Sequence, residues 1–419
     1  MNKIRCFGMA LLLGSTASLA AGSGNRVCKA GSDRPFPIVA WMGPGSDILS
    51  DSTVSDMAKA GFSLWYLQNI RDPESIQKAL ELGGRHGIGV FVVDDRIHHK
   101  KGTTGLPLES DIEAAVRQWM SYPALAGYGI RDEPAAHEFS ELTRIKNIVA
   151  GIDPARRAYV NLFPTYANSD QVGAETYADY VEGFMRSFDP SVLSYDHYCI
   201  RDGEVVSPTY YENLEIIRRV SLNAEVPFSA FTLSIPHWSY PAPTEGHIRF
   251  QLYSSLAYGA GELQYFTYGA VPNKDYGDGL IDAKGNKTET YGMASKVNWE
   301  IQRMGPVLLE LKSTAVFHTD PQPSGTQEFT GHGGLEKCSG EAVLGFFEDS
   351  KGQTWLMVVN RDPFDSARVK LTFSDKVESV GELDRTKEGC TVNPVELEKQ
   401  KLSLPLAAGD GRLFRIDTM

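Results

Sequence analysis

Apolar and polar positions along the chain form two kinds of segment that alternate. Short and almost continuously apolar runs predict buried strands, and the longer stretches between them carry apolar residues three and four positions apart, which is typical of amphipathic helices. Eight such runs precede residue 270, and they are 37–41, 62–68, 89–94, 125–131, 158–163, 192–198, 227–233 and 262–268. Eight strands that alternate with helices over this length predict a (β/α)8 barrel.

The helical stretches have recognisable ends. Asp72-Pro73-Glu74 predicts the start of a helix, and Gly83-Gly84 predicts its end. A doubly wound open sheet is the competing architecture. The first predicted strand is followed by Met-Gly-Pro-Gly-Ser at 42–46, which lacks the G-x-G-x-x-G spacing of dinucleotide-binding sheets. The pattern therefore favours the barrel.

The pattern changes after Lys312. Short alternating runs at 342–347, 354–360, 367–373 and 411–416 are separated by Gly, Pro, Asp and Asn, with no helical stretch between them. This arrangement predicts an antiparallel β-sandwich. We therefore expect three parts: a signal peptide at 1–21, a (β/α)8 barrel at 22–312 and a C-terminal β-sandwich at 313–419.

The amino terminus indicates export. Lys3 and Arg5 precede the apolar stretch 9–13, and small residues follow at 18–21, which is the layout of a secretory signal peptide. The apolar stretch is too short to cross a bilayer, and no later run reaches the ~20 apolar residues of a membrane-spanning helix. The sequence predicts a secreted or periplasmic protein with no membrane span.

Charge and cysteine content narrow the partners. The chain has 53 acidic and 41 basic residues, a formal net charge of −12, and such a surface disfavours binding to nucleic acid. The spacing of the cysteines fits no zinc motif. In an oxidising compartment Cys338 and Cys390 are a candidate disulfide pair.

In a (β/α)8 barrel the active site lies at the carboxyl ends of the strands. The residues expected there are Trp41, Asp94, Arg131, Glu133, Asn161, Asp196, His197, Tyr198, Trp238, Tyr265 and Tyr268. Carboxylates that lie among aromatic rings suit cleavage of a glycosidic bond, because one carboxyl group protonates the leaving oxygen and the rings stack on sugars. No strand ends in a lysine for a Schiff base or in a metal-binding His-x-His, so we expect neither a cofactor nor a metal.

Glu133 is the first candidate for the reaction. It follows a glycine-rich strand, and two-residue alternation places Gly127, Gly129 and Arg131 on the same inward face, so that two missing side chains leave space beneath the carboxylate. The alternative is that Asp132 caps the following helix while Glu133 is only solvated.

Three segments together resemble a known family. Tyr-Gly-Ile-Arg-Asp-Glu-Pro at 128–134, Leu-Ser-Tyr-Asp-His-Tyr at 193–198 and Gln-Tyr-Phe-Thr-Tyr at 264–268 are similar to the β-galactosidase-like glycoside hydrolases of the retaining (β/α)8 clan. The resemblance is to the secreted Asp-Glu-Pro relatives of polysaccharide-degrading Bacteroidetes. It implies that Glu133 is the acid/base. The chain departs from the clan at strand seven, because 227–234 contains no glutamate to act as nucleophile.

Asp196 is the preferred second carboxylate. It shares the parity of Ser194 and Tyr198, which turns a polar face inward, and only one strand separates it from Glu133. Asp94, Asp95 and Glu262 are the remaining candidates for this role. The alternative is that Asp196 takes no part in the reaction and is a buried hydrogen-bond partner of an arginine such as Arg131.

These observations favour a glycoside hydrolase that acts on a poly- or oligosaccharide through paired carboxylates. Two other functions stay open. One is a carbohydrate-binding barrel without a nucleophile, which would have no second carboxylate near Glu133. The other is a lyase for acidic polysaccharides, which would need a basic cluster such as Arg96, Arg131 and Arg201.

Overall fold

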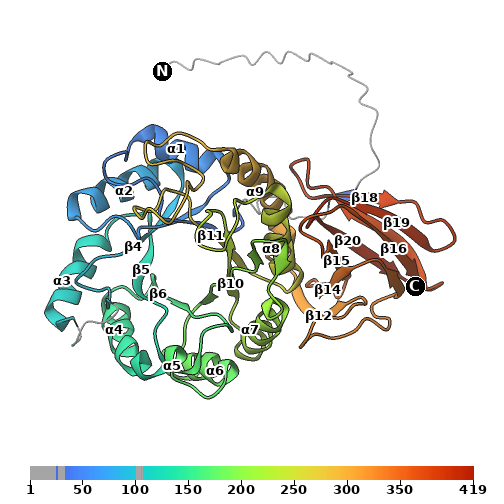
Figure 1. The fold of residues 1–419 in the computed structure, drawn as a ribbon, viewed down its shortest axis with the longest axis horizontal. Helices are drawn as coiled ribbons and strands as arrows, with labels where there is room; N and C mark the ends of the chain where they lie inside the picture. The colour runs from blue at the N-terminus through green and yellow to red at the C-terminus, as the bar shows by residue number, and fades with distance from the viewer. Residues whose placement is uncertain (1–24, 27–33, 101–104, 106) are drawn as a thin grey trace, which may run out of the picture.

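The computed structural model describes residues 25–26, 34–100, 105 and 107–419. Eight parallel strands form a closed barrel (Figure 1), because β11 pairs with β2 through Gln264 and Val39. In chain order the barrel strands are β2 (Ile38–Trp41), β3 (Leu64–Tyr66), β4 (Gly89–Val92), β5 (Leu125–Asp132), β6 (Arg157–Leu162), β7 (Leu193–Tyr195), β10 (Phe228–Leu233) and β11 (Glu262–Phe266). Each strand overlaps one predicted apolar run, and the predicted barrel is confirmed.

Helices surround the barrel in Figure 1. They are α1 (Asp51–Lys59), α2 (Pro73–His86), α3 (Glu109–Trp119), α4 (Phe139–Ile152), α5 (Ser169–Val172), α6 (Tyr177–Phe188), α7 (Tyr210–Ala224), α8 (Glu245–Ala257) and α9 (Glu289–Leu308). Asp72 caps α2, since its side chain accepts a 2.8 Å hydrogen bond from the Ser75 amide. The predicted end of α2 at Gly83-Gly84 is wrong. The helix ends at Gly87, whose φ of +69° suits glycine, whereas Gly83 lets the helix approach Val90 of β4.

The C-terminal part is an antiparallel sandwich of two sheets, as predicted. The larger sheet has the order β1 (Asn25–Arg26), β18 (Thr391–Val395), β17 (Val377–Leu383), β20 (Gly411–Thr418), β15 (Thr354–Asn360), β14 (Ala342–Glu348) and β12 (Lys312–His318). The smaller sheet has the order β13 (Leu335–Ser339), β16 (Ala367–Phe373) and β19 (Lys401–Leu406). Leu344, Phe346, Leu371 and Phe414 pack in the core between them. Strand β1 belongs to this sandwich and not to the barrel.

Helix α8 lies between the barrel and the larger sandwich sheet (Figure 1). Every residue from His247 to Ala257 is buried, because β10 and α9 cover one side of the helix while β14, β15 and β20 cover the other. The sheet comes so close that a Cβ atom at Gly345 would collide with the Ala257 carbonyl oxygen. The sandwich therefore completes the burial of a barrel helix.

A buried charge network connects the same two parts. The Arg249 guanidinium on α8 donates hydrogen bonds to Glu300 of α9 at 2.8 Å and to Asp410 of the sandwich at 3.0 Å. Arg385 donates to Asp410 at 2.7 Å from the sandwich side. Burial raises the pKa of Asp410, but the hydrogen bond from Arg385 and the charges of Arg385, Arg249 and Arg412 lower it below its ordinary value. Each buried charge in the network thus has a partner.

The predicted Cys338–Cys390 disulfide is wrong. Cys338 is a free thiol that packs against the sandwich core, and burial raises its pKa to about 12. Cys390 is disulfide-bonded, and it lies on the barrel side, with its sulfur 4.0 Å from the Arg303 carbonyl oxygen of α9. The two cysteines therefore belong to different layers of the molecule. The predicted signal peptide at 1–21 lies outside the described residues.

No helix in the described part of the chain is both long enough and apolar enough to cross a membrane.

Removal of the sandwich should prevent the barrel from folding as a soluble unit. A chain of residues 22–312 lacks β14, β15 and β20, so it exposes the apolar outer side of α8 and leaves Arg249 without Asp410. We expect this truncated chain to aggregate, as measured by size-exclusion chromatography beside the full-length protein. A soluble monomer with a cooperative unfolding transition would show that the barrel is independent of the sandwich.

Candidate active site

The end of β5 contains a bulge that changes which side chains point into the barrel. Gly129 pairs with Tyr159, but the next pair is Arg131 with Val160, followed by Asp132 with Asn161. The extra residue in β5 reverses the alternation beyond it. The expected inward position of Arg131 is therefore wrong: Arg131 binds Glu138 at 3.0 Å.

Glu133 leaves the strand in a left-handed conformation, with φ of +48°. Its amide donates a 2.9 Å hydrogen bond to the Asn161 carbonyl, which fixes this turn. The Glu133 side chain lines a cavity of about 400 Å³ together with His99, Arg131, Glu138 and Phe163. Because such a φ is rare for a residue with a side chain, the turn re-aims the carboxylate at a local conformational cost.

The empty space expected beneath Glu133 does not exist. A Cβ atom at Gly129 would collide with the Tyr66 hydroxyl, and one at Gly127 would come within 2.8 Å of the Phe91 ring. The two glycines therefore make room for aromatic side chains from β3 and β4. Burial and the Asp132 charge raise the pKa of Tyr66, whose hydroxyl has no hydrogen-bond partner in the described part of the chain.

Asp196 follows β7 and is only 9% exposed. Among the described residues its Oδ1 atom has no hydrogen-bond partner, and no arginine pairs with it. The alternative of a buried pair with Arg131 is therefore wrong, because Arg131 binds Glu138. Burial raises its pKa well above the ordinary range, and the Glu133 and Asp132 charges raise it further. The barrel thus brings three carboxyl groups from two different strands into mutual electrostatic contact.

A hydrogen-bonded lattice inside the barrel orients Asn161 toward these carboxyl groups. The Asn161 amide oxygen accepts a 2.8 Å hydrogen bond from Ser194, so its NH2 group faces the opposite way and donates to Asp132 at 3.3 Å. The same amide opposes the rise in the pKa of Asp196. Gln264 donates to Ser194 at 2.8 Å and accepts from Tyr159 at 2.9 Å. Asn161 thus lies near the carboxyl end of β6, the strand between β5 and β7.

Trp41 belongs to this lattice, and its expected role as a sugar-binding residue is wrong. Its ring is 2% exposed and stacks on Tyr66 with 4.1 Å between ring centroids. Its Nε1 atom donates a 2.7 Å hydrogen bond to Gln264. The indole therefore fills the barrel interior.

Three further side chains that were expected to bind a ligand point toward the helices. Asp94 binds Arg96 at 2.6 Å and accepts a 2.8 Å hydrogen bond from Trp119 of α3. Tyr265 donates a 2.8 Å hydrogen bond to Asn298 of α9, and Tyr268 packs edge-on against Phe62. Asp94, Tyr265 and Tyr268 are therefore corrected to structural residues, because their side chains contact Trp119 of α3, Asn298 of α9 and Phe62.

Asp95 and Glu262, which were also candidates for the second carboxylate, form ion pairs away from Glu133. Asp95 binds Lys100 at 2.7 Å on the surface. Glu262 lies at the start of β11, at the opposite end of the barrel, and binds Arg157 at 2.8 Å. Asp196 is thus the candidate whose surroundings remain compatible with a role beside Glu133.

His197 and Tyr198 take opposite sides of the chain after β7. His197 faces α7, where its Nε2 atom is 3.2 Å from the Thr209 hydroxyl, and burial lowers its pKa to about 3, so the ring is neutral. His197 was expected in the site, and it instead faces the helix layer. Tyr198 lies on the other side, where its ring packs near Tyr240 and Phe266, and its pKa is raised by burial and then by the Asp196 charge.

Trp238 is the most exposed aromatic side chain of the site, at 69%. It has a left-handed backbone, with φ of +47°, and its ring lies 5.6 Å from that of Tyr276. Tyr276 in turn stacks on His237 with 4.5 Å between centroids. An aromatic face held in the open by an unusual backbone conformation is suited to stacking on a sugar ring.

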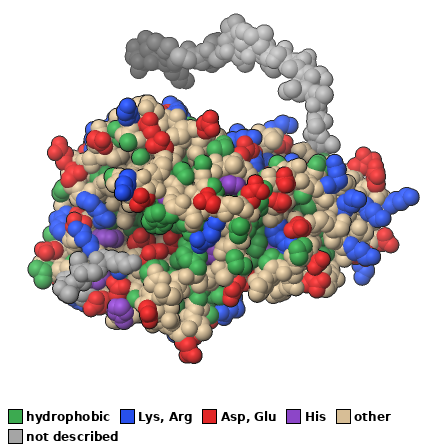
Figure 2. All heavy atoms as spheres, viewed as in Figure 1, with side chains coloured by type: hydrophobic (Ala, Val, Ile, Leu, Met, Phe, Trp, Pro, Cys, Tyr) green, Lys and Arg blue, Asp and Glu red, His purple; other side chains and the backbone are tan. Residues whose placement is uncertain are grey.

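We call the aromatic residues around Trp238 the aromatic wall. Besides Trp238 and His237 it comprises four residues that the sequence analysis did not select, namely Tyr166, Tyr240, Phe266 and Tyr276. Tyr166, Tyr240 and Tyr276 lie in loops after β6, β10 and β11, where the sequence has no periodic pattern that predicts direction. Figure 2 shows this face of the molecule, with acidic side chains inside a hollow in the barrel and hydrophobic side chains along its edge.

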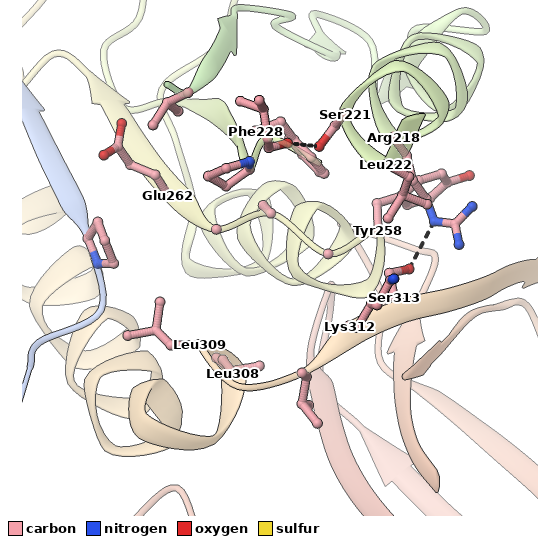
Figure 3. A pocket seen from close by; sticks show the side chains of 18 of the residues that line it. Arg218, Ser221, Leu222, Phe228, Tyr258, Glu262, Leu308, Leu309, Lys312 and Ser313 are labelled. Atoms are coloured by element: carbon pink, nitrogen blue, oxygen red, sulfur yellow. Dashed lines mark hydrogen bonds between the residues drawn. The ribbon is translucent and has the colours of Figure 1, made fainter. Parts of the chain in front are cut away.

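A second cavity, of about 670 Å³, lies at the amino-terminal end of the barrel (Figure 3). It is built from the end of α7, the starts of β11 and β12 and the end of α9, and Leu222, Leu308 and Leu309 supply apolar lining. The cavity also contains Glu262 of β11, whose carboxylate forms the ion pair with Arg157 described above. This arrangement differs from the cluster of carboxyl groups found at the other end.

No group of three or more His, Cys, Asp or Glu side chains in the described ranges is arranged to hold a metal ion.

Comparison with known proteins identifies the fold. No protein-family model matches the chain, and no curated protein sequence matches it significantly. A family 39 glycoside hydrolase from Bacteroides cellulosilyticus has a similar structure, with a TM-score of 0.53 and 12% identity over 92% of this chain and 82% of that one. A family 5 glycoside hydrolase from Bacteroides vulgatus gives a TM-score of 0.55 and 10% identity over 91% and 89%.

A β-galactosidase from Marinomonas ef1 matches with a TM-score of 0.48 and 11% identity over 67% of this chain, which spans only 63% of that enzyme's length. The first two likenesses, at their low identities, establish the shared fold, a (β/α)8 barrel with a C-terminal β-sandwich.

Asp196 should lower the stability of the protein at neutral pH. Because its pKa is higher in the folded chain than in the unfolded chain, the free energy of unfolding falls as pH rises above about 4, the ordinary value for aspartate. Asp196→Asn removes this effect. We expect the Tm of the variant to exceed that of the wild type by at least about 2 °C at pH 7 and to approach it at pH 4.

The matched control is Asp278→Asn, at an exposed aspartate after the aromatic wall. Thermal unfolding of this variant should follow the wild type at both pH values. A destabilised Asp196→Asn variant at pH 7 would mean that the ionised carboxylate is held by favourable contacts.

Proposed function

We propose that the protein is a secreted glycoside hydrolase that cleaves a glycosidic bond in a poly- or oligosaccharide. The observation that carries this proposal is that Glu133 and Asp196 follow the carboxyl ends of β5 and β7, with only β6 between these strands, and that the Glu133 charge raises the pKa of Asp196. Acid-assisted glycoside cleavage needs two carboxyl groups on opposite sides of the scissile bond and a surface that positions the sugar. The fold shared with two Bacteroides glycoside hydrolases supports the same class of reaction.

The two carboxyl groups have different environments, and this difference suggests their roles. A general acid must hold a proton at the working pH, and a raised pKa serves that purpose. Asp196 is buried next to two carboxylates, which favours its protonated form. We therefore assign the proton in the free site to Asp196. Glu133 then acts as the base or the nucleophile. The resemblance in sequence favours the reverse assignment, with Glu133 as acid/base.

The other two functions are less well supported. A binding barrel without a second carboxylate is disfavoured because Asp196 is close enough to Glu133 for the charge of one to affect the other. A lyase would need a basic cluster in the cleft, but Arg96 binds Asp94 and Arg131 binds Glu138. Of the three arginines considered for this cluster, only Arg201 forms no ion pair among the described residues.

We also propose a more specific enzyme type and a location for the protein. A β-galactosidase-like enzyme of the Bacteroidetes type agrees with the Asp-Glu-Pro segment at 132–134, and export agrees with the sequence pattern of residues 1–21. Both the Asp-Glu-Pro segment and the N-terminal sequence pattern are consistent with a polysaccharide-degrading enzyme in the periplasm or outside the cell.

Glu133→Gln and Asp196→Asn should each lower turnover by at least ~10², because each removes one of the two carboxyl groups while preserving shape. Activity is measured as release of reducing ends from a panel of plant and host glycans, with Asp278→Asn as the control that retains activity. Full activity in either variant would exclude that residue from the reaction.

Aryl glycosides with a dinitrophenolate leaving group separate the roles of the two residues. This leaving group departs without a proton, so a variant that lacks only the acid keeps its first bond-breaking step. We expect Asp196→Asn to retain more activity on these substrates than Glu133→Gln. The opposite result would assign the acid role to Glu133.

A further inference from the structure

The loop after β7 places one cation on the aromatic wall. It contains a small hairpin, β8 (Ile200–Arg201) with β9 (Val205–Val206), and the Asp202 amide in this hairpin donates a 2.9 Å hydrogen bond to the Ser239 carbonyl. The hairpin is thus attached to the segment that carries Trp238. Arg201 therefore belongs to the same wall of the cleft as the exposed indole.

Two tyrosine rings hold the Arg201 guanidinium. Its Cζ atom lies 5.2 Å from the centroid of Tyr240 and 5.8 Å from that of Tyr166. Such cation–π contacts fix the plane of the group but use none of its five N–H donors. Among the described residues Arg201 forms no salt bridge, although the hairpin itself contains Asp202 and Glu204.

This situation is unusual in a chain with an excess of acidic residues. Arg131 and Arg96, near the same rim, each have a carboxylate partner at 3.0 Å or less. The Arg201 charge also lowers the pKa of His197, although burial is the larger cause. The donors of Arg201 therefore remain available to a ligand.

The position of Arg201 relative to the carboxyl groups gives the cleft two ends of opposite charge. Tyr198 contacts Tyr240 at 5.9 Å, and the pKa values of Tyr198 and Tyr166 are both raised by burial and by the Asp196 charge. Tyr240 and Tyr198 thus connect Arg201 with the surroundings of Asp196. Asp132 and Glu133 make the other end of the cleft acidic and unfavourable for an anion, while Asp196 holds the proton.

We propose that Arg201 is a specificity-determining residue that binds an anionic substituent, a carboxylate or a sulfate, on the sugar in the cleft. The planar guanidinium can donate two parallel hydrogen bonds to either group. A sugar stacked on the aromatic wall would then direct its anionic group toward Arg201 and its glycosidic bond toward Glu133 and Asp196. The inferred substrate class is an acidic glycan, and the inference rests on the proposed function only in placing the scissile bond.

The test measures binding and cleavage separately. The full-length Glu133→Gln variant is titrated by calorimetry with a panel of plant, algal and host oligosaccharides. Each uronate-bearing member is matched by its carboxyl-reduced form, and each sulfated member by its desulfated form, so the two sources of negative charge are distinguished. Cleavage of the same panel is followed with the wild-type enzyme.

We expect at least one acidic member to bind on the order of tenfold to a hundredfold more tightly than its neutral match, as a charged hydrogen-bonded pair implies. Arg201→Gln should abolish this preference while leaving the affinity for the neutral form unchanged. Arg201→Lys keeps the charge but not the planar fork, and it should retain part of the preference.

Arg368→Gln is the matched control, because Arg368 lies on the sandwich and hydrogen-bonds Ser403 at 3.2 Å. Its preference should equal that of the wild type. The inference is overturned if no acidic member is preferred, or if the preference survives in Arg201→Gln. Binding that depends on Arg201 but is not followed by cleavage would support the inference about Arg201 and reject the hydrolase proposal. Cleavage of neutral members alone would support the hydrolase proposal and overturn the inference about Arg201.

Discussion

Closure of the parallel barrel between β11 and β2 is the constraint on which the candidate site depends. In a closed barrel all carboxyl strand ends meet at one rim, so β5 and β7 present their last residues to the same space with only β6 between them. Asn161 at the end of β6 then lies between the Asp132 and Asp196 side chains. A lattice of Ser194, Gln264 and Trp41 beneath it keeps these positions fixed.

The site itself departs from regular geometry in ways that cost stability. Glu133 and Trp238 have left-handed backbones, which cost of order 1–3 kcal/mol each, and Asp196 is buried with an Oδ1 atom that lacks a hydrogen-bond partner in the described chain. These features follow the carboxyl ends of the barrel strands β5, β7 and β10. Conformational and electrostatic costs of this kind persist only where the surrounding structure determines the local geometry.

The sandwich supplies part of that support from outside the barrel. It covers the outer side of α8 and pairs Arg249 with Asp410, while α9 contributes Glu300 to the same network. Since α8 also packs against β10, the sandwich stabilises the strand that precedes the Trp238 loop. The C-terminal domain thus contributes to the site without placing a residue in it.

The sequence alone determined the barrel, the sandwich and the neighbourhood of the site. Continuous apolar runs at a regular spacing report burial on both faces of parallel strands, and they located all eight barrel strands. The strand-end rule then selected Glu133, Asn161, Asp196 and Tyr198, which lie together. These inferences hold because they depend on local periodicity and on one general property of the fold.

Only the tertiary structure decided which way individual side chains point. The β5 bulge reversed Arg131, and hydrogen bonds with α3 and α9 hold Asp94 and Tyr265 toward the helices. The pattern also did not show the burial of α8 on all sides, the separation of Cys338 from Cys390 or the tyrosine rings around Arg201. Each depends on contacts between segments far apart in the chain, and neither periodicity nor composition records such contacts.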